Sequence, residues 1–293
     1  MVIKETFSDK VFNFFNVLLT ILITLIVLYP LIYILSASFS DPMAVMNGEV
    51  LLIPVDFTFA GYQKVFQNED IVTGYLNSIQ YTIVGTAVNL VMTVLGAYPL
   101  SRKDFYGRNV LTAFFAFTMF FGGGMIPTYL VIQDLGLLNN FWVMILPGAV
   151  SVWSMVIVRT FFQSSIPDEL REAAVIDGCS NTRLLMTIIL PLSIPVLAVI
   201  TMQYAVGHWN AYFNALIYIT DREKYPLQMV LRELLMQSKM DEMMDTEGAV
   251  TQQMLAESLK YAVMVVASVP VLLLYPFLQR YFVKGVMVSA IKG

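Results

Sequence analysis

Six long stretches of this chain contain no Asp, Glu, Lys or Arg. They are residues 11–40, 71–101, 109–133, 135–158, 184–220 and 261–279, and no other uncharged run exceeds nine residues. A helix that crosses the hydrocarbon core of a membrane needs about 20 predominantly apolar residues. The pattern therefore predicts an all-α membrane protein with six transmembrane helices.

We expect these spans to cover the central part of each uncharged stretch. The first run is too long for the apolar region of a signal peptide and lacks a small-residue cleavage pattern, so we expect it to be retained. Prolines lie within or at the ends of the spans and predict kinked helices. The expected spans are Asn16–Ala37, Tyr75–Leu100, Leu111–Val131, Phe141–Phe162, Thr187–Gly207 and Lys260–Phe282.

The Lys and Arg residues are distributed unevenly between the two sides that six spans define. Eleven of the 17 lie on the side of the two termini, whereas acidic residues are concentrated on the other side. Cytoplasmic segments carry the excess of Lys and Arg. Both the N and the C terminus are therefore predicted to be cytoplasmic.

The composition excludes several classes of function. Charged residues make up 13% of the chain, against about a quarter in soluble domains. The formal net charge is −4 and no basic run is present, so nucleic-acid binding is not expected. His208 is the only histidine, which excludes a multi-histidine metal site, and Cys179 is the only cysteine, which excludes an internal disulfide. No metal site and no enzymatic activity are expected.

Two segments on the outer side have local patterns. Within Phe39–Thr73, residues Val50–Ile53 have the composition of a strand, and within His208–Glu257 the stretch Pro226–Lys239 has the spacing of an amphipathic helix. The glycines at 122–124 lack the Lys and Ser/Thr that follow in a phosphate-binding loop, so they predict a bend or close packing inside the third span.

The charged segment between the fourth and fifth spans has the signals of a short helix. Ser165 is a capping candidate, Pro167 fits the first turn, and Asp168 favours the positive end of the helix dipole. Gly178 provides a left-handed stop, and Ser180 or Asn181 can cap a second helix.

The spacing within this segment carries a resemblance to a family. Glu172-Ala173-Ala174, then Gly178 after three residues, then Ile188-x-Leu190-Pro191 matches the EAA signature of the membrane subunits of bacterial binding-protein-dependent ABC importers. A charged cytosolic loop without this role is the alternative interpretation. The segments 39–42, 101–108 and 117–127 further resemble the carbohydrate-uptake branch. That branch includes the second maltose permease and, more similar still, permeases for aldouronate, rhamnogalacturonan and alginate fragments.

The resemblance implies a type I ABC importer permease fold, with a single permease domain over 1–293. It implies a coupling helix near 166–179 that docks into a cytoplasmic ATPase, with Glu172, Ala173, Ala174, Asp177 and Gly178 as its site residues. It also implies that the C-terminal tail 283–293, which ends in Lys-Gly, reaches between the ATPases. A frayed tail is the alternative.

The energy source for transport must come from another subunit. The chain has no G-x-x-x-x-G-K-[ST] loop, and no span carries an Asp, Glu, Lys or Arg in its interior, as proton- or sodium-driven carriers usually do. We expect no cofactor on this chain, with ATP and Mg used by the partners. The expected partners are a second homologous permease, two ATP-binding subunits, an extracytoplasmic solute-binding protein and membrane lipid. The alternative is a secondary carrier or channel without an ATPase.

Polar and aromatic residues gather at the outer end of the fifth span. If the helix continues that far, Tyr204, His208 and Tyr212 share one face, and amides lie beside them. We expect this region to contact an oligosaccharide, and the resemblance implies an acidic one. The expected location of the chain is the bacterial cytoplasmic (inner) membrane, which it crosses several times. An aromatic belt at the membrane interface is the alternative. The candidate substrate-path residues are Gln203, Tyr204, His208, Trp209, Asn210 and Asn214.

Overall fold

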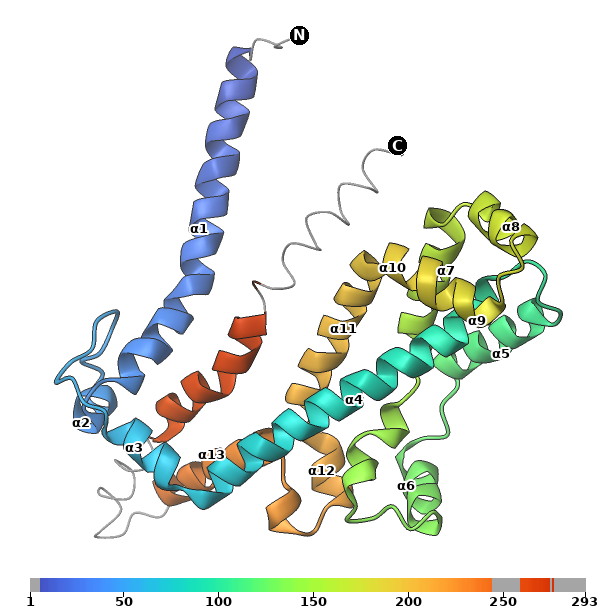
Figure 1. Ribbon diagram of the computed structural model, residues 1–293. Coiled ribbons are helices and arrows are strands. Elements are labelled where there is room, and N and C mark those ends of the chain that lie inside the picture. The colour runs from blue at the N-terminus through green and yellow to red at the C-terminus, as the bar shows by residue number, and fades with distance from the viewer. Residues whose placement is uncertain (1–5, 244–258, 275, 277–293) are drawn as a thin grey trace. The chain divides into compact units, whose positions relative to one another are not determined.

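A computed structural model of the chain describes residues 6–243, 259–274 and 276. Every regular element in these ranges is helical (Figure 1). The α-helices are α1 (Phe7–Ser38), α2 (Pro42–Met46), α3 (Ala60–Gln67), α4 (Glu69–Ser101), α5 (Arg108–Phe120), α6 (Met125–Asp134), α7 (Val152–Ser165), α8 (Asp168–Ile176), α9 (Asn181–Leu184), α10 (Leu190–Leu192), α11 (Ile194–Trp209), α12 (Phe213–Tyr218) and α13 (Leu227–Met243). Three 3₁₀ helices, η1 (Phe141–Met144), η2 (Leu146–Gly148) and η4 (Arg222–Lys224), and a π-helical turn, η3 (Leu185–Ile189), complete the set, with a further apolar helix at Leu259–Leu274.

Two of the predicted spans are single long helices. α1 contains the predicted span Asn16–Ala37, and α4 contains Tyr75–Leu100. At 1.5 Å per residue, a helix of 32 residues is about 48 Å long, more than the roughly 30 Å of a hydrocarbon core. Both helices are therefore long and apolar enough to cross a membrane.

Three of the predicted spans are broken rather than continuous. α5 and α6 meet at 113°, the segment Phe141–Gly148 meets α7 at 51°, and Asn181–Leu192 meets α11 at 82°. The first break lies at the glycines 122–124, where Gly124 has φ +86°, as the sequence predicted for this run. The third lies at Ser193, between Pro191 and Pro195, because a proline removes a backbone donor and clashes with the preceding turn.

The predictions for the two outer segments differ in outcome, and those for the sixth span and the C-terminal tail lie partly or wholly outside the described residues. α13 confirms the amphipathic helix at Pro226–Lys239, whereas Val50–Ile53 forms bends and no strand. The sixth span, Lys260–Phe282, is described only in part, by the helix Leu259–Leu274. The C-terminal tail 283–293 lies outside the described residues.

The chain divides into two units, residues 1–69 with 231–269, and residues 70–230 with 270–293. In the first unit, hydrogen bonds of serine hydroxyl groups join the end of α1 to the loop that follows. Ser36 donates to the carbonyl oxygen of Leu52 at 2.7 Å, and the amide of Val55 donates to Ser40 at 3.1 Å. The side chains of residues 7–32 on α1 are exposed, which suits a helix surrounded by lipid or by another subunit.

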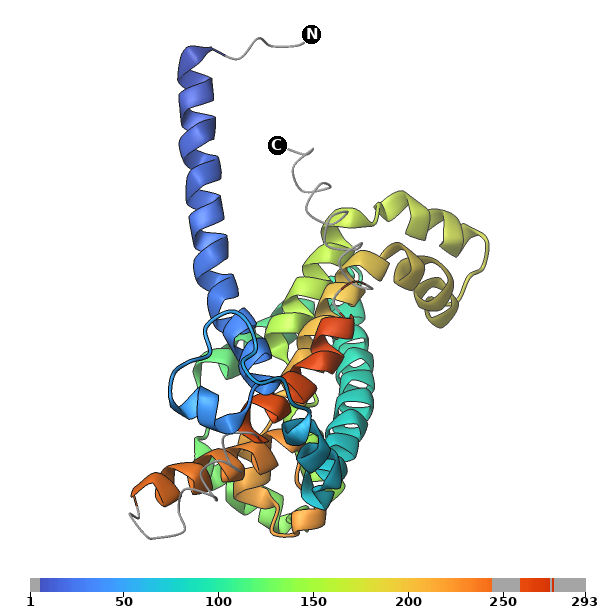
Figure 2. The ribbon, with the colours of Figure 1, turned by 90° about the vertical axis from the view of Figure 1, so that its left-hand side faces the viewer.

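The second unit holds the segment with the family signature. α4 runs through it, with α8 and α9 at one end and α6 and α12 at the other in both views (Figures 1 and 2). A hydrophobic core formed by α4, α7 and α11 extends to Ala174 of α8 and Leu184 of α9. α8 is therefore packed against the same hydrophobic core as α4, α7 and α11.

Candidate functional site

α8 is the short helix that the sequence predicted, with one correction at its start. Pro167, not Ser165, occupies the N-cap position, because α7 continues through Ser165. Asp168 and Glu169 lie in the first turn, where the helix dipole favours acidic side chains.

Gly178 ends α8 in the left-handed conformation, with φ +71°. The amide of Cys179 donates to the carbonyl of Ala174 at 2.9 Å, and the amide of Gly178 donates to Val175 at 3.0 Å. A Cβ at Gly178 would meet nothing within 4 Å. Glycine is therefore favoured at this position by backbone conformation alone. Ser180 caps α9 by accepting from the amide of Arg183 at 3.3 Å, as predicted.

One face of α8 is packed and the other is open. Ala174 is buried against the core, whereas Glu172, Ala173 and Asp177 are exposed. Ile176 is 84% exposed although it is apolar. The signature residues thus present acidic and small side chains outward, with an apolar residue beside them. Such a face is suited to seating in a groove of another protein.

Ion pairs hold α8 against the loop between α4 and α5. Lys103 Nζ lies 2.6 Å from a carboxylate oxygen of Asp168, and Arg171 lies 3.3 Å from Asp104. Asp104 also pairs with Arg102 at 2.5 Å. The pair of Lys103 and Asp168 is exposed on both sides, and such a pair contributes only about 0.2–1 kcal/mol. The pairs of Lys103 with Asp168 and of Asp104 with Arg171 join α8 to the loop, whereas the pair of Arg102 with Asp104 lies within the loop itself.

The same contacts lower the pKa of both carboxyl groups. The hydrogen bond from Arg102 lowers the pKa of Asp104 to about 2, and the hydrogen bond from Lys103 lowers the pKa of Asp168. Both groups are therefore ionised at neutral pH. Sequence reasoning missed this cluster because Asp104 and α8 are far apart in the chain. The only signal was one acidic residue, Asp104, among the basic residues of 102–108.

The candidate substrate-path residues separate into two groups. Tyr204 and Trp209 are buried within the chain, and the Tyr204 hydroxyl lies 2.6 Å from Oγ1 of Thr93 on α4. Nε2 of His208 lies 2.5 Å from Oδ1 of Asn89, whose amide donates to the carbonyl of Gly148. These side chains join α11 to α4 and η2.

The side chains of the other group are exposed or half-buried. Gln203 and Asn210 are exposed and Asn214 is half-buried. α11 ends at Trp209, two residues beyond the predicted end at Gly207, and Asn210 caps it, so the condition for one helical face through Tyr212 is not met. The Asn210 amide donates to the carbonyl of Val206 at 2.9 Å, which competes with continuation of the helix.

In the part of the chain that the structure describes, no three His, Cys, Asp or Glu side chains gather in a way that could hold a metal ion.

Comparison with known proteins identifies the class of this protein. The family model described as the binding-protein-dependent transport system inner membrane component matches residues 4–288. The chain belongs to this family and is a membrane protein, a permease component of such a transport system.

Individual relatives are similar over nearly the whole chain. The polygalacturonan/rhamnogalacturonan transport system permease protein YtcP of Bacillus subtilis (strain 168) is 41% identical over 278 residues, which are 93% of this chain and 95% of that protein. Protein LplC of the same strain is 41% identical over 291 residues, covering 99% and 97%.

A solved structure shares the fold. A chain from a bacterial ABC transporter involved in the import of the acidic polysaccharide alginate superposes with a TM-score of 0.86 and 35% sequence identity. The match covers 96% of this chain and all of that one. Another alginate ABC transporter chain, at 14% identity and a TM-score of 0.57, supports the fold alone.

Proposed function

We propose that this chain is a membrane-spanning permease subunit of an ATP-driven ABC importer. It takes up acidic oligosaccharides that an extracytoplasmic solute-binding protein delivers. The observation that carries the proposal is α8, an exposed short helix with the EAA spacing that ends at a left-handed Gly178. The acidic substrate class is supported by relatives named for polygalacturonan, rhamnogalacturonan and alginate.

The complex contains a second homologous permease and two ATP-binding subunits. The absence of a nucleotide-binding loop in the sequence supports this assignment, because transport against a gradient needs an energy source. ATP and Mg belong to the partners, and this chain carries no cofactor of its own and no catalytic activity. A secondary carrier or channel is not favoured, since the family consists of components of binding-protein-dependent systems.

The topology that we propose has six spans in a single permease domain over 1–293, with both termini in the cytoplasm of a bacterium. Two long helices, three bent pairs and the helix Leu259–Leu274 supply six apolar segments. The excess of Lys and Arg beside the termini supports the orientation.

The coupling surface in this proposal is formed by Glu172, Ala173, Ala174, Asp177 and Gly178. Ala174 faces the core of its own chain, so its role is to seat α8, and the exposed members contact the ATPase. For the substrate path, exposure favours Gln203, Asn210 and Asn214. Tyr204, His208 and Trp209 support them from within the chain.

Replacement of Gly178 tests the ATPase partnership. A β-branched residue resists positive φ, whereas asparagine tolerates it, so Gly178→Val should distort the end of α8 and Gly178→Asn should not. For valine the left-handed conformation costs about 1–2 kcal/mol, which shifts the equilibrium constant between correctly and incorrectly ended α8 by roughly 5- to 30-fold. The measurement is the amount of ATPase that a tagged chain pulls down from membranes.

Both variants should remain in the membrane at the wild-type level. Undiminished ATPase binding by Gly178→Val would contradict the assignment of α8 as the coupling helix. A parallel loss in Gly178→Asn would show that the left-handed conformation is not the reason for the glycine.

A further inference from the structure

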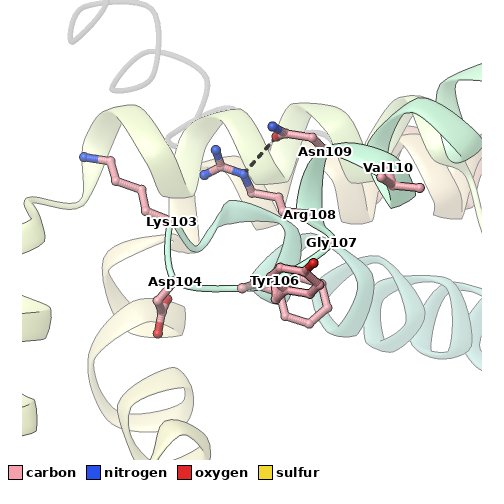
Figure 3. A pocket seen from close by; sticks show the side chains of 8 residues that line it. Lys103, Asp104, Tyr106, Gly107, Arg108, Asn109 and Val110 are labelled. Carbon is pink, nitrogen blue, oxygen red and sulfur yellow. Dashed lines mark hydrogen bonds between the residues drawn. The ribbon is translucent and has the colours of Figure 1, made fainter.

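The loop between α4 and α5 surrounds an open hollow of about 450 Å³, which the family signature does not include. Its lining residues are Lys103, Asp104, Phe105, Tyr106, Gly107, Arg108, Asn109 and Val110. In Figure 3, the nitrogen-bearing ends of Lys103, Arg108 and Asn109 lie on one side of this loop, and Asp104 and Tyr106 lie on the other. Lys103 Nζ pairs with Asp168 and Asn109 Oδ1 accepts from Arg108, so the uncommitted charged donors on this side belong to Arg108.

Arg108 is the cation of this hollow that lacks an acidic partner among the described residues. Lys103 is paired with Asp168, whereas the guanidinium of Arg108 makes only two long contacts, of 3.4 Å each, to Asn109 Oδ1 and to the carbonyl of Arg102. A guanidinium has five N–H donors in a fork that matches phosphate oxygens. Arg108 thus retains donors for an anion.

The position of the hollow favours an anion at the level of the membrane surface. Arg108 is the first residue of α5, and Val110, Phe114 and Phe117 follow it as an exposed apolar stripe at i, i+4 and i+7 spacing. Tyr106 is 99% exposed beside the start of this stripe. Aromatic and basic side chains at the end of an apolar membrane helix lie at the depth of lipid headgroups.

The backbone amides at the start of α5 are further hydrogen-bond donors beside the hollow. Gly107 occupies the N-cap with φ +86° and has no side chain that could cap the first turn. The first amides of a helix have no acceptor within the helix, so they point toward whatever occupies its end.

From these observations we propose that the hollow at 103–110 binds the headgroup phosphate of an anionic phospholipid, with Arg108 as its main ligand and Tyr106 beside the glycerol region. The acyl chains lie along Val110, Phe114 and Phe117. Basic residues immediately beside a membrane helix are attracted to anionic lipids, and basic pockets between membrane helices bind anionic headgroups. This inference depends on the membrane location of the chain and not on the identity of the sugar.

The test uses the full importer complex, purified in detergent with this chain at full length. Native mass spectrometry measures the binding of added phosphatidylglycerol and, separately, of phosphatidylcholine. We expect Arg108→Gln to weaken phosphatidylglycerol binding about fivefold, as estimated for one basic residue near a membrane surface. Arg108→Lys should retain most of the binding, and phosphatidylcholine binding should not change.

Two further variants support the interpretation. Tyr106→Ala alters a side chain that packs against little, so it should keep the fold and still weaken the binding of this lipid. Arg183→Gln removes the same charge from an exposed position on α9 that does not line the hollow, and it should bind lipid as the wild type does.

Four results would overturn the proposal. Wild-type phosphatidylglycerol binding by Arg108→Gln is the first, and an equal loss in Arg183→Gln is the second. The third is loss of the ATPase or the second permease from the Arg108→Gln complex, which would assign the loop to subunit contact. Displacement of the lipid by millimolar inorganic phosphate would indicate a site for free phosphate instead.

Discussion

Two glycines in this chain are required for different physical reasons. At Gly178 the backbone has positive φ and the surroundings are open, so conformation alone favours glycine. At Gly85 the backbone is helical, and a Cβ would lie 2.5 Å from Cε1 and Nε2 of His208. Only the first requirement could be predicted from the sequence, because it depends on neighbours along the chain. The second depends on a residue 123 positions away, and no local pattern signals it.

The exposed amides at the end of α11 provide a test of the substrate path. Asn210→Ala removes a side chain that is exposed and lies at a helix end, so the fold should tolerate the change. If Asn210 bonds a sugar hydroxyl during passage, transport should fall about fivefold, since a hydrogen bond contributes about 1 kcal/mol. The measurement is the initial rate of oligosaccharide uptake.

The affinity of the binding protein for the sugar and the amount of this chain in the membrane are the controls, and both should stay constant. Normal uptake kinetics in Asn210→Ala and in Gln203→Ala would place the sugar on the partner permease instead.

At the scale of helices, the elements with local signals were predicted well. α8, α9 and α13 follow from capping residues, a terminal glycine and apolar spacing, although the start of α8 moved from Ser165 to Pro167. The uncharged runs located the apolar segments, and the glycines at 122–124 predicted the first of their three bends, although not how sharp the bends are. The predicted end of the fifth span, Gly207, lies two residues before the end of α11 at Trp209, where the Asn210 side chain bonds back to the carbonyl of Val206.

Polar contacts within the second unit join α4 to α11. Thr93 meets Tyr204, and Asn89 meets His208 and the carbonyl of Gly148. Inside a membrane protein such hydrogen bonds average only about 0.6 kcal/mol, so close packing is the larger contribution. Gly85 allows this packing because its missing side chain leaves room for the His208 ring.

We therefore expect Gly85→Ala to separate α4 from α11 and to lower the thermal stability of the purified complex. Overpacking in a close-packed interior costs about 1–3 kcal/mol. Gly207→Ala is the matched control, because Gly207 is also helical and a Cβ there would meet nothing within 4 Å. That variant should be neutral or slightly stabilising. The measurement is the unfolding temperature of each variant.

A second substitution should restore stability to the Gly85→Ala variant. His208→Ala should restore part of the stability lost in Gly85→Ala, because it removes the ring that the new methyl group meets. Equal unfolding temperatures for Gly85→Ala and Gly207→Ala would contradict the packing that the structure shows.

At the scale of the whole molecule, a membrane protein whose sequence has no nucleotide-binding loop carries a short exposed helix, α8, which we propose as the contact with the ATPase. The family assignment and the fold rest on matches over nearly the whole chain. The sequence supplied the class through one spaced motif and six apolar stretches. The ion pairs that position α8 and the internal partners of Tyr204 and His208 became visible only in the fold.

The most direct test of the proposed function is uptake by the reconstituted importer. Proteoliposomes that contain this chain, its partner permease and the two ATPases, supplied with the binding protein, should accumulate a labelled oligogalacturonide only when ATP is present on the ATPase side. The purified chain alone should neither hydrolyse ATP nor move the sugar. ATP hydrolysis by this chain without other subunits, or accumulation driven by an ion gradient in the absence of the ATPases, would contradict the account.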